Sequence, residues 1–257
     1  MIHSFVAIGD SFTEGVGDAY ADGEARGWAD LLAYGLELDA ASHGEHVAYA
    51  NLAIRGRKLV PLLDEQLAPA IAQHPEMISI NGGGNDLMRP RVEIADLSRR
   101  LREATLKITD AGIHALVLAG PDPTHNIPGG ALVRRRGRAL TDEVAAWVSD
   151  LPNATYVSAF DDAVLADPAH WSPDGLHMGP LGHLRVATNC LTALGVPVPA
   201  DWDALRASLS PTVADFGSLA YWREHVLPWI GRRVQGRSSG DNRVAKRPLL
   251  APVATES

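Results

Sequence analysis

The residues best suited to chemistry begin with a serine near the amino terminus. Ser11 stands in Gly9-Asp10-Ser11, directly after the apolar run Phe5–Ile8. A serine hydroxyl is a poor nucleophile at neutral pH, so it needs a base to take its proton and an acid to orient that base. The position of Ser11 after a predicted strand favours a nucleophile. The plainer interpretation is a turn or helix N-cap serine.

A histidine and an aspartate far downstream can supply the other two groups. Asp174 and His177 stand three residues apart in Asp174-Gly175-Leu176-His177. A carboxylate at that spacing can reach the Nδ1 atom of the histidine within one turn, which fixes the tautomer and stabilises the imidazolium. We expect His177 to be the base and Asp174 its orienting acid, although Asp174 could also cap the segment that follows it. His183 is a rival base, but its distance from Asp174 favours a structural role.

A third motif, Gly82-Gly83-Gly84-Asn85-Asp86, lies between the serine and the histidine. The three motifs, in the order in which they follow one another along the chain, resemble those of the GDSL/SGNH hydrolase family, whose members are serine esterases and lipases. The resemblance covers roughly residues 1–195. It implies a flavodoxin-like three-layer α/β/α fold with a central parallel sheet, and a reaction that needs neither a metal nor an organic cofactor.

The resemblance also implies the groups that stabilise the oxyanion of the tetrahedral intermediate. They are the backbone N–H groups of Ser11 and Gly56 and the side-chain amide of Asn85. Gly56 corresponds to the family's glycine in the block Asn51–Gly56, and glycine suits an amide that must approach a substrate closely. Asn85 could instead be a left-handed turn residue, and Gly56 only a loop glycine.

Arginines near this block depart from the family pattern. Arg55 precedes Gly56, where many relatives carry a small residue. Together with Arg57 and Arg89 it could favour an anionic substrate, or all three side chains could simply be solvated.

Short apolar runs and amphipathic segments alternate along the chain, which predicts a three-layer α/β domain with right-handed crossovers. The strand-like runs are apolar on both faces, as in a buried parallel sheet; they are Phe5–Ile8, Val47–Leu52, Met77–Ile80, Ala115–Ala119 and Thr155–Phe160. Between them, apolar residues recur at helical spacing, after Trp28, over Leu59–Ile71, over Ile94–Ile108 and over Leu140–Val148. Ser11 and Asn85 each follow a strand, so both should lie at the carboxyl edge of the sheet, where such folds bind ligands.

The pattern changes after about residue 195. We expect a hydrolase domain over 1–195, a helical extension over 196–231 that packs on it through Trp222, Trp229 and Ile230, and a basic flexible tail over 232–257. The tail lacks apolar periodicity, so it should be solvated and dispensable for hydrolysis of small esters. A weak contact with an anionic surface is the alternative.

Composition excludes several classes of protein. The chain has 257 residues, a net charge of −8 and 46% hydrophobic residues, which argues for a sizeable core and against a general nucleic-acid binder. A single cysteine, Cys190, permits no disulfide within the chain and suggests a reducing, cytoplasmic location. No basic and apolar leader precedes Ser11, and no apolar run has the length of a membrane span. The sequence carries no signal for the oligomeric state.

Three other patterns are weaker candidates for a functional site. Residues 236–240 fit G-x-S-x-G, the nucleophile elbow of another hydrolase fold, but no apolar strand precedes them. The histidines show no metal-binding spacing. The basic run Arg134–Arg138 suggests a solvated helix face, with anion binding as the sharper alternative.

Together these residues predict a serine carboxylester hydrolase that works through an acyl-enzyme on short-chain or acetyl esters. Within the enzyme class, the alternative is an acyltransferase that passes the acyl group to an alcohol. Outside it, the alternative is a catalytically silent module that binds a carbohydrate or a protein partner.

Overall fold

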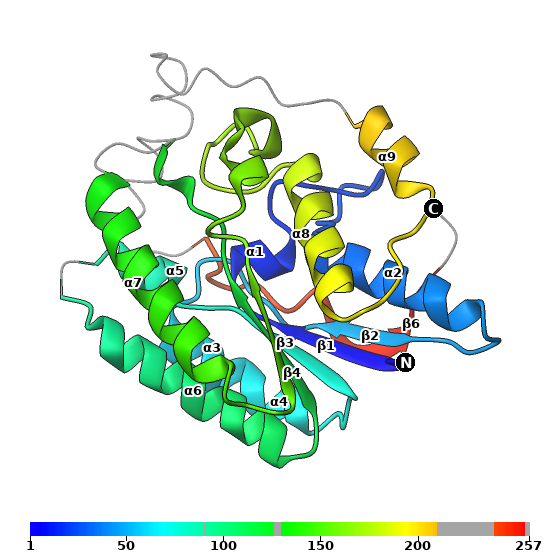
Figure 1. The fold of residues 1–257 in the computed structure, drawn as a ribbon, viewed down its shortest axis with the longest axis horizontal. Helices are drawn as coiled ribbons and strands as arrows, with labels where there is room; N and C mark the ends of the chain where they lie inside the picture. Colours follow the sequence, from blue (N-terminus) through cyan, green and yellow to red (C-terminus); the bar gives the residue numbers. More distant parts are fainter. Residues whose placement is uncertain (90, 126–129, 210–238, 255–257) are drawn as a thin grey trace.

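The computed structural model describes residues 1–89, 91–125, 130–209 and 239–254, and a six-stranded sheet forms the centre of this part of the chain (Figure 1). The strands lie in the order β5-β4-β3-β1-β2-β6. Their bounds are β1 Ser4–Ile8, β2 Ala48–Asn51, β3 Met77–Ile80, β4 His114–Ala119, β5 Ala154–Ser158 and β6 Arg247–Pro252. Strands β1 to β5 run parallel, and the predicted α/β fold is confirmed.

Helices cover both faces of the sheet, as the alternating pattern predicts (Figure 1). Helices α2 and α8 cover one face, and the run from α3 to α4 together with α6 and α7 covers the other. The bounds are α1 Ser11–Glu14, α2 Trp28–Ala41, α3 Leu59–Leu62, the π-helix η1 Leu63–Leu67, α4 Ala68–Ile71, α5 Gly84–Leu87, α6 Ile94–Asp110, α7 Gly130–Val148, α8 Pro180–Ala193 and α9 Trp202–Ser208. Three short 3-10 turns complete the described elements, η2 Pro123–His125, η3 Ala163–Ala166 and η4 Pro168–His170.

The spacing of apolar side chains explains which segments form the buried sheet and which form the helices that cover it. All four residues of β3 are buried, because helices cover both of its faces. On α6 the buried apolar residues recur every three or four positions, so one stripe faces the core; they are Leu97, Leu101, Ala104 and Ile108. The described residues include no helix that is both long enough and apolar enough to cross a membrane.

Strand β6 was not predicted. The sequence analysis placed Arg247–Pro252 in a flexible tail, but these residues pair antiparallel with β2 at the edge of the sheet. The predicted central parallel sheet therefore carries one antiparallel strand at its edge, and the expectation of a flexible tail is wrong for residues 247–252. Two prolines, Pro248 and Pro252, argue against a strand in sequence, yet an edge strand tolerates proline because one of its sides needs no ladder hydrogen bonds.

The rest of the carboxy-terminal region is described only in part. Trp202 of α9 is buried in the core beside α2 and α8. Trp222, Trp229, Ile230 and Ser238 of the second serine motif lie outside the described residues. The division of the chain near residues 195 and 231 stays a prediction.

The order of the strands predicts a crevice at the carboxyl ends of the central strands β1 and β3. From β1 the chain crosses to β2 on one side, and from β2 it returns to β3 on the other side of β1. Ligands of such folds bind where neighbouring connections diverge in this way, outside the carboxyl ends of the strands. Ser11 follows β1 and Asn85 follows β3, so the topology brings both to this crevice.

Candidate active site

Ser11 opens a one-turn helix directly after β1. The side chain of Asp10 caps this helix by accepting a hydrogen bond from the Phe12 N–H at 3.2 Å. Gly9 precedes it, and a Cβ atom there would lie 2.3 Å from Thr13 Oγ1, so only glycine allows so tight a turn. Ser11 thus stands at a fixed point of the turn, as its sequence context predicts.

Gln66 holds the end of β1 where the sheet opens. Its side-chain oxygen accepts a hydrogen bond from the Gly9 N–H at 2.8 Å, and its side-chain nitrogen donates to the Gly9 carbonyl at 3.0 Å. Gln66 is buried and lies on the π-helix η1, a geometry often found at functional sites. The Gln66 amide therefore binds both backbone groups of Gly9 beside the Ser11 turn, a contact that the sequence analysis did not predict.

Asn85 lies on α5, after a left-handed turn at Gly83 with φ of 95°. Its side-chain nitrogen donates hydrogen bonds to Asp10 Oδ2 at 2.9 Å and to the Arg57 carbonyl at 3.0 Å. An amide nitrogen carries two hydrogens, so both have a protein partner. Asn85 therefore ties the Ser11 turn to the loop that carries Gly56.

The loop of Gly56 is held by a buried carboxylate. Gly56 has φ of 73°, in the region that favours glycine. Glu14 accepts hydrogen bonds from the Arg55 backbone N–H at 2.6 Å and from its guanidinium at 2.8 and 2.6 Å. Arg57 likewise donates to Glu65 at 2.8 Å. The Arg55 and Arg57 guanidinium groups therefore bind protein carboxylates, whereas Arg89, the third arginine of the sequence analysis, lines the cavity.

His177 and Asp174 form a hydrogen-bonded pair, with 2.6 Å between His177 Nδ1 and Asp174 Oδ2. The carboxylate also accepts hydrogen bonds from the Ser172 hydroxyl at 2.6 Å and from the backbone N–H groups of Leu176 and His177. Burial acts to raise the pKa of Asp174, but the hydrogen bonds and the charge of His177 outweigh it and hold that pKa well below its ordinary value. Asp174 is therefore an ionised acceptor that orients the imidazole.

These groups line one cavity of about 630 Å³. Ser11, Gly56, Asn85 and His177 all contribute to its wall. Apolar residues also line the cavity, among them Leu118, Leu140, Val144 and Phe160. Among the described residues no hydrogen bond joins the Ser11 hydroxyl to His177, so the structure places the two in the same cavity without a direct bond.

His183 is buried on α8. Its Nδ1 accepts a hydrogen bond from the Trp28 N–H at 3.1 Å, and its Nε2 donates to the Val16 carbonyl at 3.2 Å. Burial lowers its pKa to about 4, so the ring is neutral at pH 7. Both nitrogens bind backbone groups, which suits the structural role expected for it.

Two further observations bear on the chemistry. Burial raises the pKa of Asp10 to about 6, despite the hydrogen bonds from Phe12 and Asn85. In the part of the chain that the structure describes, no three histidine, cysteine or acidic side chains gather as they would around a metal ion.

Comparison with known proteins identifies the family of this chain. The profile of the GDSL-like Lipase/Acylhydrolase family matches residues 7–185. No curated protein matches the chain by sequence.

Solved structures share the fold at low sequence identity. The lipase Lip_vut3 from a goat rumen metagenome is 18% identical, with a TM-score of 0.60 over 76% of this chain and 98% of its own. TesA is 23% identical, with a TM-score of 0.59 over 75% of this chain and 98% of its own. A catalytic mutant of Axe2, an acetylxylan esterase from Geobacillus stearothermophilus, is 20% identical, with a TM-score of 0.62 over 77% and 97%.

Proposed function

Because the chain belongs to the GDSL-like lipase/acylhydrolase family, we propose that it is an SGNH-type serine carboxylester hydrolase that acts on short-chain or acetyl esters through an acyl-enzyme. The observation that carries the proposal is one cavity lined by Ser11, Gly56, Asn85 and His177, with His177 hydrogen-bonded to Asp174.

In the proposed reaction His177 Nε2 takes the proton of Ser11 as its hydroxyl oxygen attacks the ester carbonyl. The tetrahedral intermediate collapses when the imidazolium gives that proton to the leaving alcohol, and the acyl group stays on Ser11. His177 then takes a proton from water, the hydroxide attacks the acyl-enzyme, and Ser11 recovers its proton as the acid leaves. Asp174 stays ionised and holds the imidazole through Nδ1.

Three N–H groups are the proposed donors to the oxyanion: the backbone amides of Ser11 and Gly56 and the side chain of Asn85. The Asn85 amide already donates to Asp10 and to the Arg57 carbonyl. It must therefore share or exchange one of these bonds when the oxyanion forms. A donor whose bond to substrate strengthens as charge develops acts mainly in the transition state.

Apolar residues in the cavity wall, among them Leu118, Leu140 and Val144, support the proposed uncharged acyl groups. The Arg55 and Arg57 guanidinium groups, which also line the cavity, bind Glu14 and Glu65. Lys58 and Arg89 line it as well. An acetylxylan esterase and a lipase share the fold. The likeness motivates both short-chain and acetylated-sugar substrates in the test.

The test is a panel of p-nitrophenyl esters of increasing chain length, extended to acetylated sugars. We expect turnover to be greatest with the short esters and to be lost in Ser11→Ala. His177→Ala should lower kcat by several orders of magnitude, as in triad enzymes. Equal turnover by wild type and Ser11→Ala would refute the proposal.

A further inference from the structure

The carboxy-terminal segment Ser239–Pro252 lies beyond the residues matched by the family and returns to the candidate active site. Ser239 and Asp241 line the same cavity as Ser11. Its last part, β6, pairs with β2 immediately before the loop that carries Gly56. The segment therefore reaches the site from a part of the chain to which the family resemblance assigns no role.

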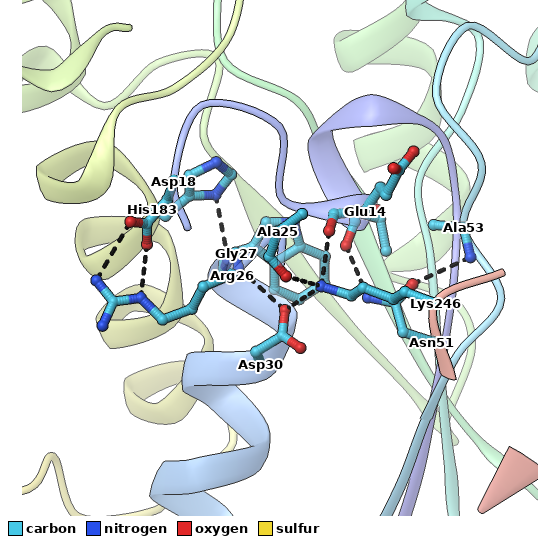
Figure 2. Close-up of polar contacts among 12 residues, drawn as sticks. Glu14, Asp18, Ala25, Arg26, Gly27, Asp30, Asn51, Ala53, His183 and Lys246 are labelled. Atoms are coloured by element: carbon cyan, nitrogen blue, oxygen red, sulfur yellow. Dashed lines mark hydrogen bonds and ion pairs between the residues drawn. The ribbon is translucent and has the colours of Figure 1, made fainter. Parts of the chain in front are cut away.

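Lys246 anchors this segment in a largely buried polar pocket. Its Nζ donates hydrogen bonds to the Glu14 carbonyl at 2.7 Å, to the Ala25 carbonyl at 2.8 Å and to Asp30 Oδ2 at 2.6 Å (Figure 2). An ammonium group has three hydrogens, so this geometry uses all of them. The Lys246 side chain is 16% exposed and that of Asp30 is 9% exposed, so solvent screens the pair little.

The partners of Lys246 belong to the elements that hold the nucleophile. Glu14 is the last residue of α1, the helix that begins at Ser11. Asp30, in the first turn of α2, also accepts a hydrogen bond from the Gly27 N–H at 2.9 Å. Lys246 thus fixes the end of the Ser11 helix against α2.

The residues next to Lys246 reach the loop of Gly56. Arg247 pairs with Asn51, whose side chain donates a hydrogen bond to the Thr13 carbonyl. The Asn51 side chain also accepts a hydrogen bond from the Ala53 N–H (Figure 2). On the other side of Lys246, Gly240 lies so close to the loop that a Cβ atom there would be 2.0 Å from the Arg55 carbonyl. One segment therefore contacts both the Ser11 helix and the loop of Gly56.

From these contacts we propose that Lys246 is a positioning residue of the active site, which sets the spacing between the Ser11 helix and the Gly56 loop. The inference rests on the proposed esterase function. Lys246 touches no reacting atom; it acts through Glu14, whose carbonyl it binds and whose carboxylate binds Arg55. Attack and oxyanion binding need both elements in register, and a misplacement of about 1 Å can cost about 100-fold in rate.

The experiment compares wild type with Lys246→Met, which keeps the length of the side chain and removes its three donors. Lys107→Met is the matched control, because Lys107 is exposed on α6. Active sites are counted by titration with a fluorophosphonate, so that kcat refers to folded and reactive molecules. Hydrogen exchange is measured on peptides that cover residues 11–16, residues 53–57 and α6.

We expect Lys246→Met to lower kcat per titrated site by about 10- to 100-fold, with KM changed less than about threefold. Exchange should accelerate at 11–16 and 53–57 and stay unchanged in α6, whereas Lys107→Met should match wild type. An unchanged kcat per site, or unchanged exchange at 53–57, overturns the proposal, because a lysine that only adds stability would lower the number of active molecules and not their rate.

Two other outcomes are also decisive. If Lys246→Met does not fold, Lys246→Gln, which retains a donor, is judged by the same criteria. If wild type neither hydrolyses esters nor reacts with the fluorophosphonate, the proposed function fails. Hydrogen exchange then decides on its own whether Lys246 couples the two elements.

Discussion

The amide of Asn85 shows how closely the candidate site is tied together at the scale of single residues. Its nitrogen binds Asp10 beside Ser11 and the Arg57 carbonyl beside Gly56, so one side chain links the three proposed oxyanion donors. The Asp174 carboxylate likewise holds His177, the proposed base, because it binds the His177 ring and two backbone amides of the same turn. Both groups are held in place before any substrate binds.

Asn85→Ala should therefore lower kcat by about 10²- to 10³-fold, as the loss of one oxyanion donor does in other hydrolases. KM should change little, because the bond to substrate strengthens mainly in the transition state. Steady-state kinetics on a short-chain ester measures both constants. A change confined to KM would mean that Asn85 only binds the ground state.

Two buried side chains, Gln66 and His183, join secondary-structure elements to one another through hydrogen bonds to the backbone. Gln66 uses a π-helical turn to reach Gly9, and so fixes the end of β1 to the helical layer. His183, on α8, accepts from the first residue of α2 and donates to the Val16 carbonyl, and so joins α8 to the loop that follows the Ser11 helix. Each side chain supplies a hydrogen-bond acceptor to a backbone N–H, Gln66 after the end of β1 and His183 at the start of α2.

Gln66→Leu should destabilise the fold, since it leaves the buried N–H and carbonyl of Gly9 without their side-chain partner. The expected cost is about 1–3 kcal/mol in the free energy of unfolding. Asp64→Asn, on the same helical run but exposed, is the control. Urea titration of the three proteins gives the values, and equal midpoints for wild type and Gln66→Leu would contradict the assigned role.

His183 should make stability depend on pH. Its pKa is lowered by burial from 6.5 to about 4 in the folded state, so the unfolded chain binds the extra proton first as the pH falls. The free energy of unfolding should therefore decrease between pH 6.5 and about 4, by up to about 3 kcal/mol.

In His183→Gln this contribution should vanish, whatever constant cost the substitution adds. The raised pKa of Asp10 acts in the opposite direction, because its proton is held more tightly in the folded state. Asp10 is present in both proteins, so the difference between their urea midpoints at each pH isolates His183. A difference that does not vary from pH 7 to pH 4 would show that the ring does not titrate as described.

For the whole molecule, the carboxy-terminal strand changes what a truncation should do. Removing residues 239–257 deletes β6, exposes the edge of β2 and removes Lys246. An uncovered strand edge is a template for aggregation. We expect lower solubility and a lower melting temperature, measured by scanning fluorimetry. A truncated protein that melts like wild type would show that the segment does not hold the fold.

The sequence predicted five strands because each is a short apolar run between turn residues, and it predicted Ser11, Asn85 and the Asp174–His177 pair as site candidates through their local motifs. It could not predict β6, because the two prolines of this edge strand argue against a strand when only the sequence is read. Nor could it predict that Lys246 binds Glu14 or that Gln66 binds Gly9, since these contacts join distant residues and leave no periodic pattern.

In the proposed reaction Ser11 becomes covalently modified during turnover. The most direct test is peptide mass spectrometry after reaction with a fluorophosphonate, with Ser11→Ala as the control. We expect a single adduct on the peptide that contains Ser11 and none in the variant. An adduct on Ser238 of the second serine motif instead, or labelling that persists in Ser11→Ala, would contradict the assignment of Ser11 as the nucleophile.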